Sequence, residues 1–264
     1  MKKFLALILA AMMILTLVSC NKDDKGDDTD KGNEGETNNV AEKTEFTYEI
    51  GAGDTAIITG YTGDDVSYGL HEVKVPAEID DREVVAIGEK AFYGSSSITS
   101  IELPDTVKSI GDFAFANCKV LASINIPETV TEIGKYAFTN CVKLASFPLP
   151  STVTVIGDGA FYGCASIKTL ELPVSLTTIG DYAFWGCTGI TSVEIPSSVK
   201  MLGKQAFWNC SKLASVQLTD SIEAIGEFAF GSVQATDGSV VAVVKAPAGS
   251  YAAEYVAASG YPTK

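Results

Sequence analysis

Five of the six cysteines recur every 23 residues, so metal or disulfide chemistry is the first possibility to consider. They are Cys118, Cys141, Cys164, Cys187 and Cys210, and Ser95 occupies the preceding position of the series. One thiolate per repeat along a line does not make the tetrahedron that zinc needs, and no histidine lies near to complete one. Parallel side chains in stacked units also lie farther apart than the roughly 3.5–4.5 Å between Cβ atoms that a disulfide requires. We therefore predict buried, reduced cysteines that pack as small hydrophobic side chains, and no metal site.

The remaining residues show no arrangement typical of an active site. His71 is the only histidine, and its polar neighbourhood favours a surface position. No nucleophile elbow, phosphate-binding loop or metal-binding helix motif occurs. Carboxylates are plentiful, but acid–base pairs work in a dry, shaped pocket, and a uniform repeat offers none. The sequence favours a binding protein over an enzyme, and it predicts no cofactor.

Aromatic residues at one repeated position are the first candidate for binding. They directly follow the recurrent Ala-Phe pairs, and the candidates are Tyr93, Tyr162, Trp185 and Trp208, together with Tyr182 three residues before Trp185. If this edge faces water, it is a ladder of stacked rings, and exposed aromatic patches are typical of protein or sugar binding. The alternative is that each ring lies over the turn of the next unit and only seals the structure.

A second repeated position is polar and forms the weaker candidate. Its members are Glu102, Asn125, Glu171, Glu194 and Gln217, and Pro148 interrupts the series. Such a column is either a solvated strand face or a flat, hydrogen-bonding surface. Stacked Glu171 and Glu194 would repel each other mildly. A divalent cation between them is disfavoured, because hard cations need six or more oxygen ligands.

A repeat of constant length must position these columns. Seven hydrophobic-Gly pairs are each followed by Ala-Phe, and they start 23 residues apart: Ile87-Gly88, Ile110-Gly111, Ile133-Gly134, Ile156-Gly157, Ile179-Gly180, Leu202-Gly203 and Ile225-Gly226. So regular a period indicates a solenoid in which each unit is one coil that stacks on its neighbours.

One coil contains three predicted elements. Residues 112–116 are expected to form one short helical turn. Asn117 follows at a position that is Gly or Asn in six of the seven repeats, and these residues tolerate a left-handed conformation. Alternation at Ile124 and Ile126 predicts a half-buried strand that Pro127 ends. A second short strand leads to Ile133. The sequence thus predicts an α/β solenoid of 23-residue coils, each with two short parallel strands and one short helical turn.

Three columns are expected to point inward and form the core. The phenylalanine spine consists of Phe92, Phe115, Phe138, Phe161, Phe184, Phe207 and Phe230. The aliphatic columns are Ile98, Leu121, Leu144, Ile167, Ile190 and Leu213, and Leu103, Ile126, Leu149, Leu172, Ile195 and Leu218. Each buried phenylalanine should contribute about 1.5–3 kcal/mol.

The pattern Ile-Gly-x-x-Ala-Phe-x-Asn/Gly-Cys followed by Leu-x-Ser-Ile-x-Ile-Pro resembles the BspA-type (Treponema-like) leucine-rich repeat over residues 46–264. The resemblance implies an N-terminal cap with a partial repeat in 46–86, repeats in 87–231, and a C-terminal cap in 232–264. The capping helix is expected over Tyr251 to Ser259 with Ser250 as its N-cap. Members of the family are mostly bacterial surface proteins, and some are implicated in adhesion to host proteins.

The N-terminus predicts export and anchoring. Lys2 and Lys3 precede an apolar run that is short for a membrane span, so residues 1–19 are interpreted as a signal peptide. Leu17-Val18-Ser19-Cys20 resembles a bacterial lipobox, which implies a lipid anchor at Cys20; an ordinary cleaved signal peptide is the alternative. Residues 20–45 are polar and acidic, so we expect a disordered tether. The predicted location is the bacterial outer membrane or cell surface.

Charge limits the partners. The formal net charge is −14 and Arg82 is the only arginine, so nucleic-acid binding is disfavoured. An acidic chain is also repelled by anionic lipid, which leaves the N-terminal lipid as its contact with the membrane. We expect a monomer that binds a host or bacterial surface protein, with a glycan as the alternative ligand.

Overall fold

A computed structural model describes residues 45–64, 67, 69–145, 147–231 and 242–263. The predicted signal peptide, the predicted anchor Cys20 and nearly all of the predicted tether lie outside these residues. The chain from Lys43 to Lys264 is one compact unit. Among its described residues, no helix is long and apolar enough to cross a membrane.

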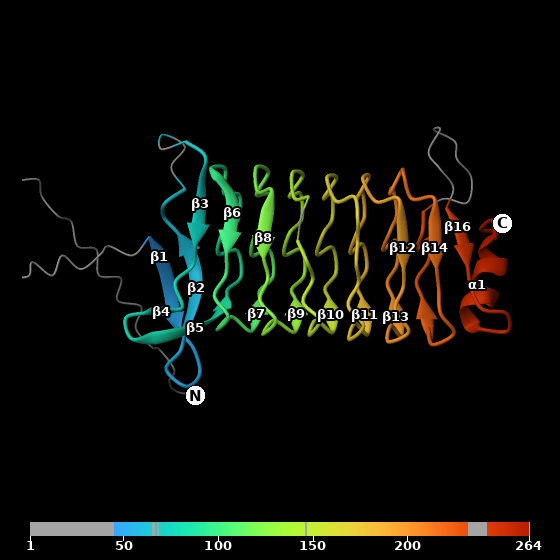
Figure 1. Ribbon diagram of the computed structural model, residues 1–264, viewed down its shortest axis with the longest axis horizontal. Helices are drawn as coiled ribbons and strands as arrows, with labels where there is room; N and C mark the ends of the chain where they lie inside the picture. The colour runs from blue at the N-terminus through green and yellow to red at the C-terminus, as the bar shows by residue number, and fades with distance from the viewer. Residues whose placement is uncertain (1–44, 65–66, 68, 146, 232–241, 264) are drawn as a thin grey trace, which may run out of the picture. The chain divides into compact units, whose positions relative to one another are not determined.

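Stacked coils of this unit form one long sheet (Figure 1). The sheet has ten strands in the order β1-β2-β5-β7-β9-β10-β11-β13-β15, with β4 paired to β5. The path strands are β1 (Phe46–Ile50), β2 (Ala56–Tyr61), β5 (Arg82–Ile87), β7 (Ser109–Ile110), β9 (Glu132–Ile133), β10 (Val155–Ile156), β11 (Thr178–Ile179), β13 (Met201–Leu202) and β15 (Ala224–Ile225). From β2 onward the pairing along this path is parallel, and Ile133 pairs with Ile156 one repeat later. The predicted second strand of each coil is therefore confirmed.

The predicted first strand forms two separate sheets on the other side of the coils. One contains β3 (His71–Lys74), β6 (Ile98–Glu102) and β8 (Ser123–Asn125); the other contains β12 (Ser192–Glu194), β14 (Ser215–Gln217) and β16 (Val243–Lys245). We call this side the first-strand face. The two coils between the sheets have no strand at residues 147–149 and 169–172, which we call the ladder gap. The expectation of two strands in every coil is wrong there, because Pro148 has no N–H to donate to the ladder.

The predicted helical turn is a series of tighter turns. In the coil of Phe115, the N–H of Ala114 donates to the carbonyl of Gly111, three residues back. The next N–H, that of Phe115, donates instead to Ala137 in the following coil at 2.7 Å. Alternate N–H groups thus join neighbouring coils, which an α-helix would not allow because it would pair them internally. Positive φ angles at Phe113 (57°) and Asn117 (62°) bound the segment.

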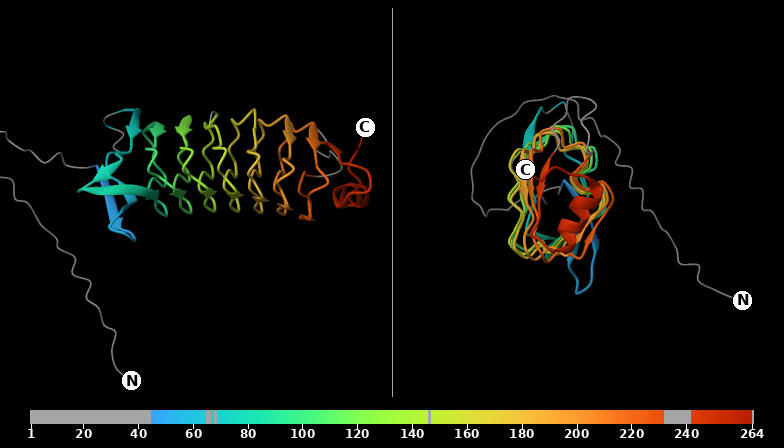
Figure 2. Two further views of the ribbon diagram at one scale, coloured as in Figure 1. Left: turned by 60° about the horizontal axis from the view of Figure 1, so that its bottom comes forward. Right: turned by 90° about the vertical axis from the view of Figure 1, so that its right-hand side faces the viewer.

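The phenylalanine spine lies in the centre of the coils, as predicted. Six of its members are at most 1% exposed and Phe230 is 4% exposed. Ring centroids from Phe92 to Phe207 are 5.1–5.3 Å apart in successive coils. The aliphatic columns are buried except for Leu149 and Leu172, which are half-buried at the ladder gap. In Figure 2 the coils overlie one another when the unit is viewed along its axis, so like residues stack on like.

Both ends of the stack carry caps. At the N-terminal end β1 pairs antiparallel with β2, and β4 (Glu78–Ile79) forms a hairpin with β5 through Asp80 and Asp81, which both have positive φ. At the other end α1 (Tyr251–Ser259) is the predicted helix, and its N-cap Ser250 accepts a hydrogen bond from the N–H of Ala253.

Candidate functional site

Two columns of aromatic side chains meet along one edge of the turns. One column follows each buried phenylalanine, and the other lies three residues earlier, at the position with positive φ. Their members in the C-terminal coils define the aromatic edge: Tyr162, Tyr182, Trp185, Trp208 and Phe228. Four of these side chains are half-buried, and Phe228 is 53% exposed.

Stacking orders part of the aromatic edge. The rings of Tyr162 and Trp185 are nearly parallel, with centroids 4.4 Å apart and an interplanar angle of 3°. Trp208 meets Phe228 edge to face at 5.6 Å. Partial burial, with a smaller contribution from Tyr136, raises the pKa of Tyr162, so its hydroxyl is neutral at physiological pH. The edge therefore presents ordered aromatic rings that are partly accessible to the solvent.

Other rings of the same columns act as covers for the turns. Phe113 stacks on Tyr136 at 5.1 Å, and a Cβ atom on Gly159 would lie 2.2 Å from the Tyr136 ring. The Tyr136 ring therefore lies over the turn of the next coil, as the sealing interpretation expects. Sequence reasoning missed Phe113 and Phe228, although their spacing from Tyr136 and Tyr182 was a usable signal.

Tyr93 does not join the aromatic edge. It is 53% exposed, but it lies three coils from Tyr162. Ala116 and Thr139 occupy the column between them, and both are buried. No continuous run of rings therefore connects Tyr93 with the other candidates.

The polar column lies on the first-strand face, and its members have different partners. Glu102 forms an ion pair with Lys74 at 2.7 Å, and Asn125 bridges the backbone of Leu103, accepting from its N–H at 2.7 Å and donating to its carbonyl at 3.1 Å. Gln217 donates to the carbonyl of Leu218. Glu171 and Glu194 are exposed and form no ion pair with a described residue. The described part of the chain contains no group of three or more His, Cys, Asp or Glu that could hold a metal.

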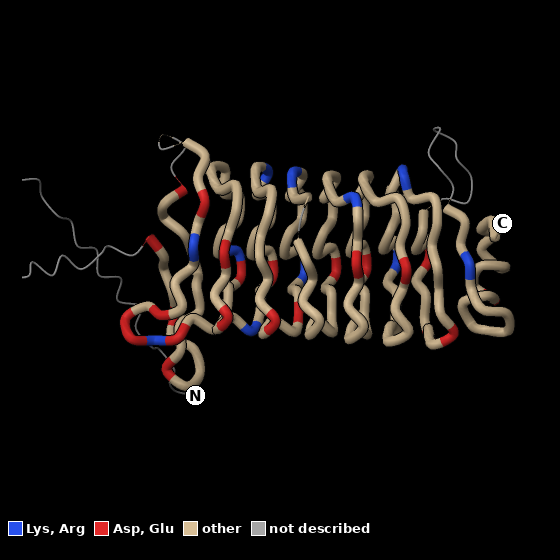
Figure 3. Tube along the Cα trace, viewed as in Figure 1, with Lys and Arg blue, Asp and Glu red and all other residues tan. Residues whose placement is uncertain are grey.

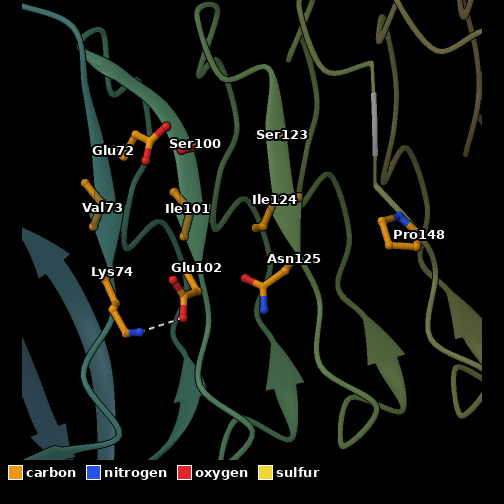
Figure 4. A pocket seen from close by; sticks show the side chains of 10 residues that line it. All are labelled: Glu72, Val73, Lys74, Ser100, Ile101, Glu102, Ser123, Ile124, Asn125 and Pro148. Carbon is orange, nitrogen blue, oxygen red and sulfur yellow. Dashed lines mark hydrogen bonds and ion pairs between the residues drawn. The ribbon is translucent and has the colours of Figure 1, made fainter.

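Three shallow hollows follow the first-strand face. Figure 4 shows the first, of about 390 Å³, which extends from Glu72 and Lys74 past Asn125 to Pro148. The other two, of about 340 and 460 Å³, lie along the ladder gap and adjoin at Thr169, Leu170 and Glu171. Four members of the polar column thus line these hollows: Glu102, Asn125, Glu171 and Glu194.

The cysteine column is structural, as predicted. All five thiols are free and buried, and each Sγ donates to a phenylalanine carbonyl of the preceding coil at 3.0–3.2 Å. His71 is half-buried at the start of β3, where its Nε2 lies 3.2 Å from the Tyr61 hydroxyl. That hydroxyl donates in turn to Glu45 at 3.0 Å. Burial, assisted by Glu45, raises the pKa of Tyr61 to about 12.

Parallel strands, short turns and a buried ladder of like residues define a leucine-rich-repeat solenoid. The model of the BspA type leucine rich repeat region matches residues 85–213 and 131–240, with six copies, and the chain belongs to this family. Leucine-rich-repeat proteins are in general non-catalytic scaffolds for protein interaction.

The chain is similar to solved structures of bacterial leucine-rich repeat proteins. A leucine-rich repeat protein of T. pallidum is 34% identical, with a TM-score of 0.63 over 69% of this chain and 83% of the other. A Bacteroides ovatus leucine-rich repeat protein is 24% identical, with a TM-score of 0.48 over 76% and 70% of the two chains. A leucine rich cell surface protein of Faecalibacterium prausnitzii is 25% identical, with a TM-score of 0.43 over 70% and 72%. Comparison with curated proteins gave no significant match.

Proposed function

We propose that the protein is a lipid-anchored bacterial surface protein that binds a partner protein through the aromatic edge. The observation that carries the proposal is the parallel stack of Tyr162 and Trp185 beside Trp208 and Phe228, all at least partly accessible. Tryptophan and tyrosine contribute most at protein interfaces, because they bury large rigid surfaces at low entropic cost. Membership of the leucine-rich-repeat class supports a scaffold for protein interaction.

A capture experiment tests the aromatic edge. The full chain is immobilised and exposed to an array of bacterial and host surface proteins, beside the Trp185→Ala/Trp208→Ala double variant. We expect a partner whose binding is lost in the double variant. The matched control is Tyr93→Ala, which removes an exposed ring outside the aromatic edge and should leave binding unchanged. Binding that is equal in the double variant and the wild type would contradict the assignment.

Glycan capture is the second candidate function, and the partial exposure of Tyr162 and Trp185 favours it. The two rings are parallel and stacked on each other, so a sugar would contact the parts of both rings that the stack leaves accessible. A glycan array probed with the wild type and with Tyr162→Ala and Trp185→Ala variants tests this alternative. Sugar binding that survives both substitutions would exclude these two rings as the glycan site.

The anchor is proposed from Cys20 and the preceding residues 1–19. Radiolabelled palmitate supplied to cells that express the full chain should label the wild type but not the Cys20→Ser variant. The variant should also be released from the membrane fraction, because no other lipid attachment is proposed. Equal labelling of the two proteins would refute the anchor. We further propose that the anchored protein is a monomer, which light scattering in detergent would test.

A further inference from the structure

The backbone of the ladder gap is unpaired at positions that are paired in the coils that follow it. The N–H of Ile195 donates to Gln217 at 2.9 Å, and that of Leu218 donates to Lys245 at 2.8 Å. Four N–H groups in the gap donate no hydrogen bond to any described residue: those of Phe147, Leu149, Leu170 and Leu172. Backbone donors that lack a protein partner are satisfied by water or by a ligand. The gap is therefore a place where a ligand can gain main-chain hydrogen bonds.

Apolar side chains line the same place. The two adjoining hollows of the ladder gap are lined by the half-buried Phe147 and Leu172. Val174 at the rim is 82% exposed, the largest exposure among the described large hydrophobic side chains. Covering Val174 and the accessible parts of the two half-buried side chains would remove apolar surface from water, which favours binding.

The charge of the gap selects a cationic ligand. Glu171 and Glu194 lie in neighbouring coils and line one hollow together. Neither forms an ion pair within the described chain, and Lys168, which lines the same hollow, pairs with neither. On the same face Glu102 is already neutralised by Lys74 (Figure 4). Lysine or arginine of a partner would relieve the repulsion between the two stacked carboxylates.

We propose that the ladder gap binds an extended peptide segment of a partner protein in which apolar residues alternate with lysine or arginine. An extended segment presents alternate side chains to opposite sides, so its apolar and basic groups can reach the hollow and the glutamates while its carbonyls meet the free N–H groups. The proposal is independent of the aromatic edge, which lies on the turns and not on the first-strand face.

Titration calorimetry on the full chain tests the proposal with three synthetic peptides. In the first, valine alternates with lysine; in the second, valine alternates with glutamate; in the third, serine alternates with lysine. We expect measurable binding of the valine–lysine peptide, weaker binding of the serine–lysine peptide, and none of the valine–glutamate peptide. Binding of the valine–glutamate peptide at equal affinity, or no binding of any peptide, would overturn the proposal.

Two variants locate the site. The double variant Glu171→Gln/Glu194→Gln should lower the affinity for the valine–lysine peptide by about tenfold or more. The matched control Glu102→Gln should bind this peptide with the affinity of the wild type. Pro148→Asn introduces a backbone donor and a side chain that can bridge the preceding coil as Asn125 does. It should fold, join residues 147–149 to the ladder of β8 and weaken binding. Unchanged affinity in either the double glutamine variant or Pro148→Asn would refute the site, and unchanged affinity in Trp185→Ala/Trp208→Ala would separate it from the aromatic edge.

Discussion

Phe161 illustrates how strongly one residue of the spine supports the coils. It is fully buried and stacks between Phe138 at 5.2 Å and Phe184 at 5.3 Å, and Phe147 contacts it from the first-strand face at 4.6 Å. Phe161→Ala should lower the free energy of unfolding by about 3–5 kcal/mol, because it leaves a cavity that the stacked neighbours cannot fill. Exposed Lys168→Ala should cost under about 0.5 kcal/mol. Urea unfolding of both variants measures the difference, and equal shifts would contradict the core assignment.

The cysteine column predicts a loss of stability at alkaline pH. Burial raises the pKa of Cys164 and of Cys210 to about 12, and it also raises that of Cys187. A free thiol has a pKa of about 8.5, so the unfolded state releases these protons first as pH rises. Their contribution to stability is complete below about pH 8.5 and then falls by about 1.4 kcal/mol per pH unit for each thiol.

Urea unfolding between pH 7 and pH 10 measures this slope. The Cys164→Ala variant should show a shallower decline than the wild type, because one titrating group is removed. In the native state the column thiols should react with a disulfide reagent only as fast as the coils open, and all of them should react at once in denaturant. If the free energy of unfolding fell equally steeply with alkaline pH in the wild type and the variant, burial would not raise the pKa of these thiols.

At the scale of elements, the glycine after each second strand is fixed by the approach of neighbouring coils. A Cβ atom on Gly203 would lie 2.3 Å from the carbonyl carbon of Gly180 and 2.4 Å from the N of Asp181. Backbone atoms cannot give way, so Gly203→Ala should cost about 3 kcal/mol by overpacking. Gly94→Ala should cost about 1 kcal/mol, because Gly94 has φ of 74° but open space around it. Thermal unfolding ranks the two, and a reversed order would contradict the packing argument.

Asp64 fastens a loop of the N-terminal cap to the first coil. Its carboxylate accepts the N–H groups of Ser96 and Ser97 at 2.9–3.0 Å and the Ser97 hydroxyl. Burial raises its pKa, but these hydrogen bonds outweigh burial and hold the pKa of Asp64 below its usual value. The stabilisation is therefore present above about pH 4, the unfolded value, and is lost as pH falls through the lower folded value.

Asp64→Asn should cost about 2 kcal/mol at neutral pH, because an amide accepts these hydrogen bonds more weakly than a carboxylate. The difference from the wild type should shrink as the pH falls below 4. Exposed Asp105→Asn is the control and should change stability little at any pH. A difference between wild type and Asp64→Asn that is constant with pH would contradict the role of the ionised carboxylate.

The sequence predicted most elements because the repeat supplies seven aligned copies of each position. The spine, the cysteine column, the left-handed Asn117 column and the helix that Ser250 caps all follow from residue type and spacing. The positive φ of Phe113 and its column could not be predicted, because aromatic residues rarely adopt it and only Gly159 hints at it. The sequence shows Pro148 at the ladder gap. It does not show that two successive coils lack a strand there, because this depends on hydrogen bonding between neighbouring coils.

At the scale of the molecule, charges contribute little to holding the described unit together. Figure 3 shows acidic and basic residues interspersed along the Cα trace of the coils, with acidic ones gathered around the β4–β5 hairpin. Except for the half-buried Arg82, the side chains of the ion pairs among the described residues are exposed, for example Lys200 with Glu223 at 3.3 Å, and such exposed pairs are worth about 0–1 kcal/mol. Stability must therefore come from burial between neighbouring coils, which makes the ends of the stack the critical places.

The C-terminal cap closes the stack with two tyrosines as well as with α1. Tyr255 accepts from the N–H of Ala229 and donates to the carbonyl of Gly226, and Tyr261 donates to Gly231 at 2.8 Å. Both rings meet Phe230, the last member of the spine, edge to face. Deletion of residues 249–264 would expose Phe230 and unpair these backbone groups at once. We expect the truncated chain to melt at lower temperature and to associate as concentration rises.

Light scattering and thermal unfolding across a concentration series measure both effects of the deletion. The matched control is Tyr251→Ala, which alters a 44% exposed ring of α1 but leaves Tyr255 and Tyr261 in place. This variant should stay monomeric and keep nearly all of its stability, because the rings that contact Phe230 edge to face are those of Tyr255 and Tyr261. A truncated chain that remains monomeric and as stable as the control would show that the last coil needs no cover, and that α1 serves another purpose than closing the solenoid.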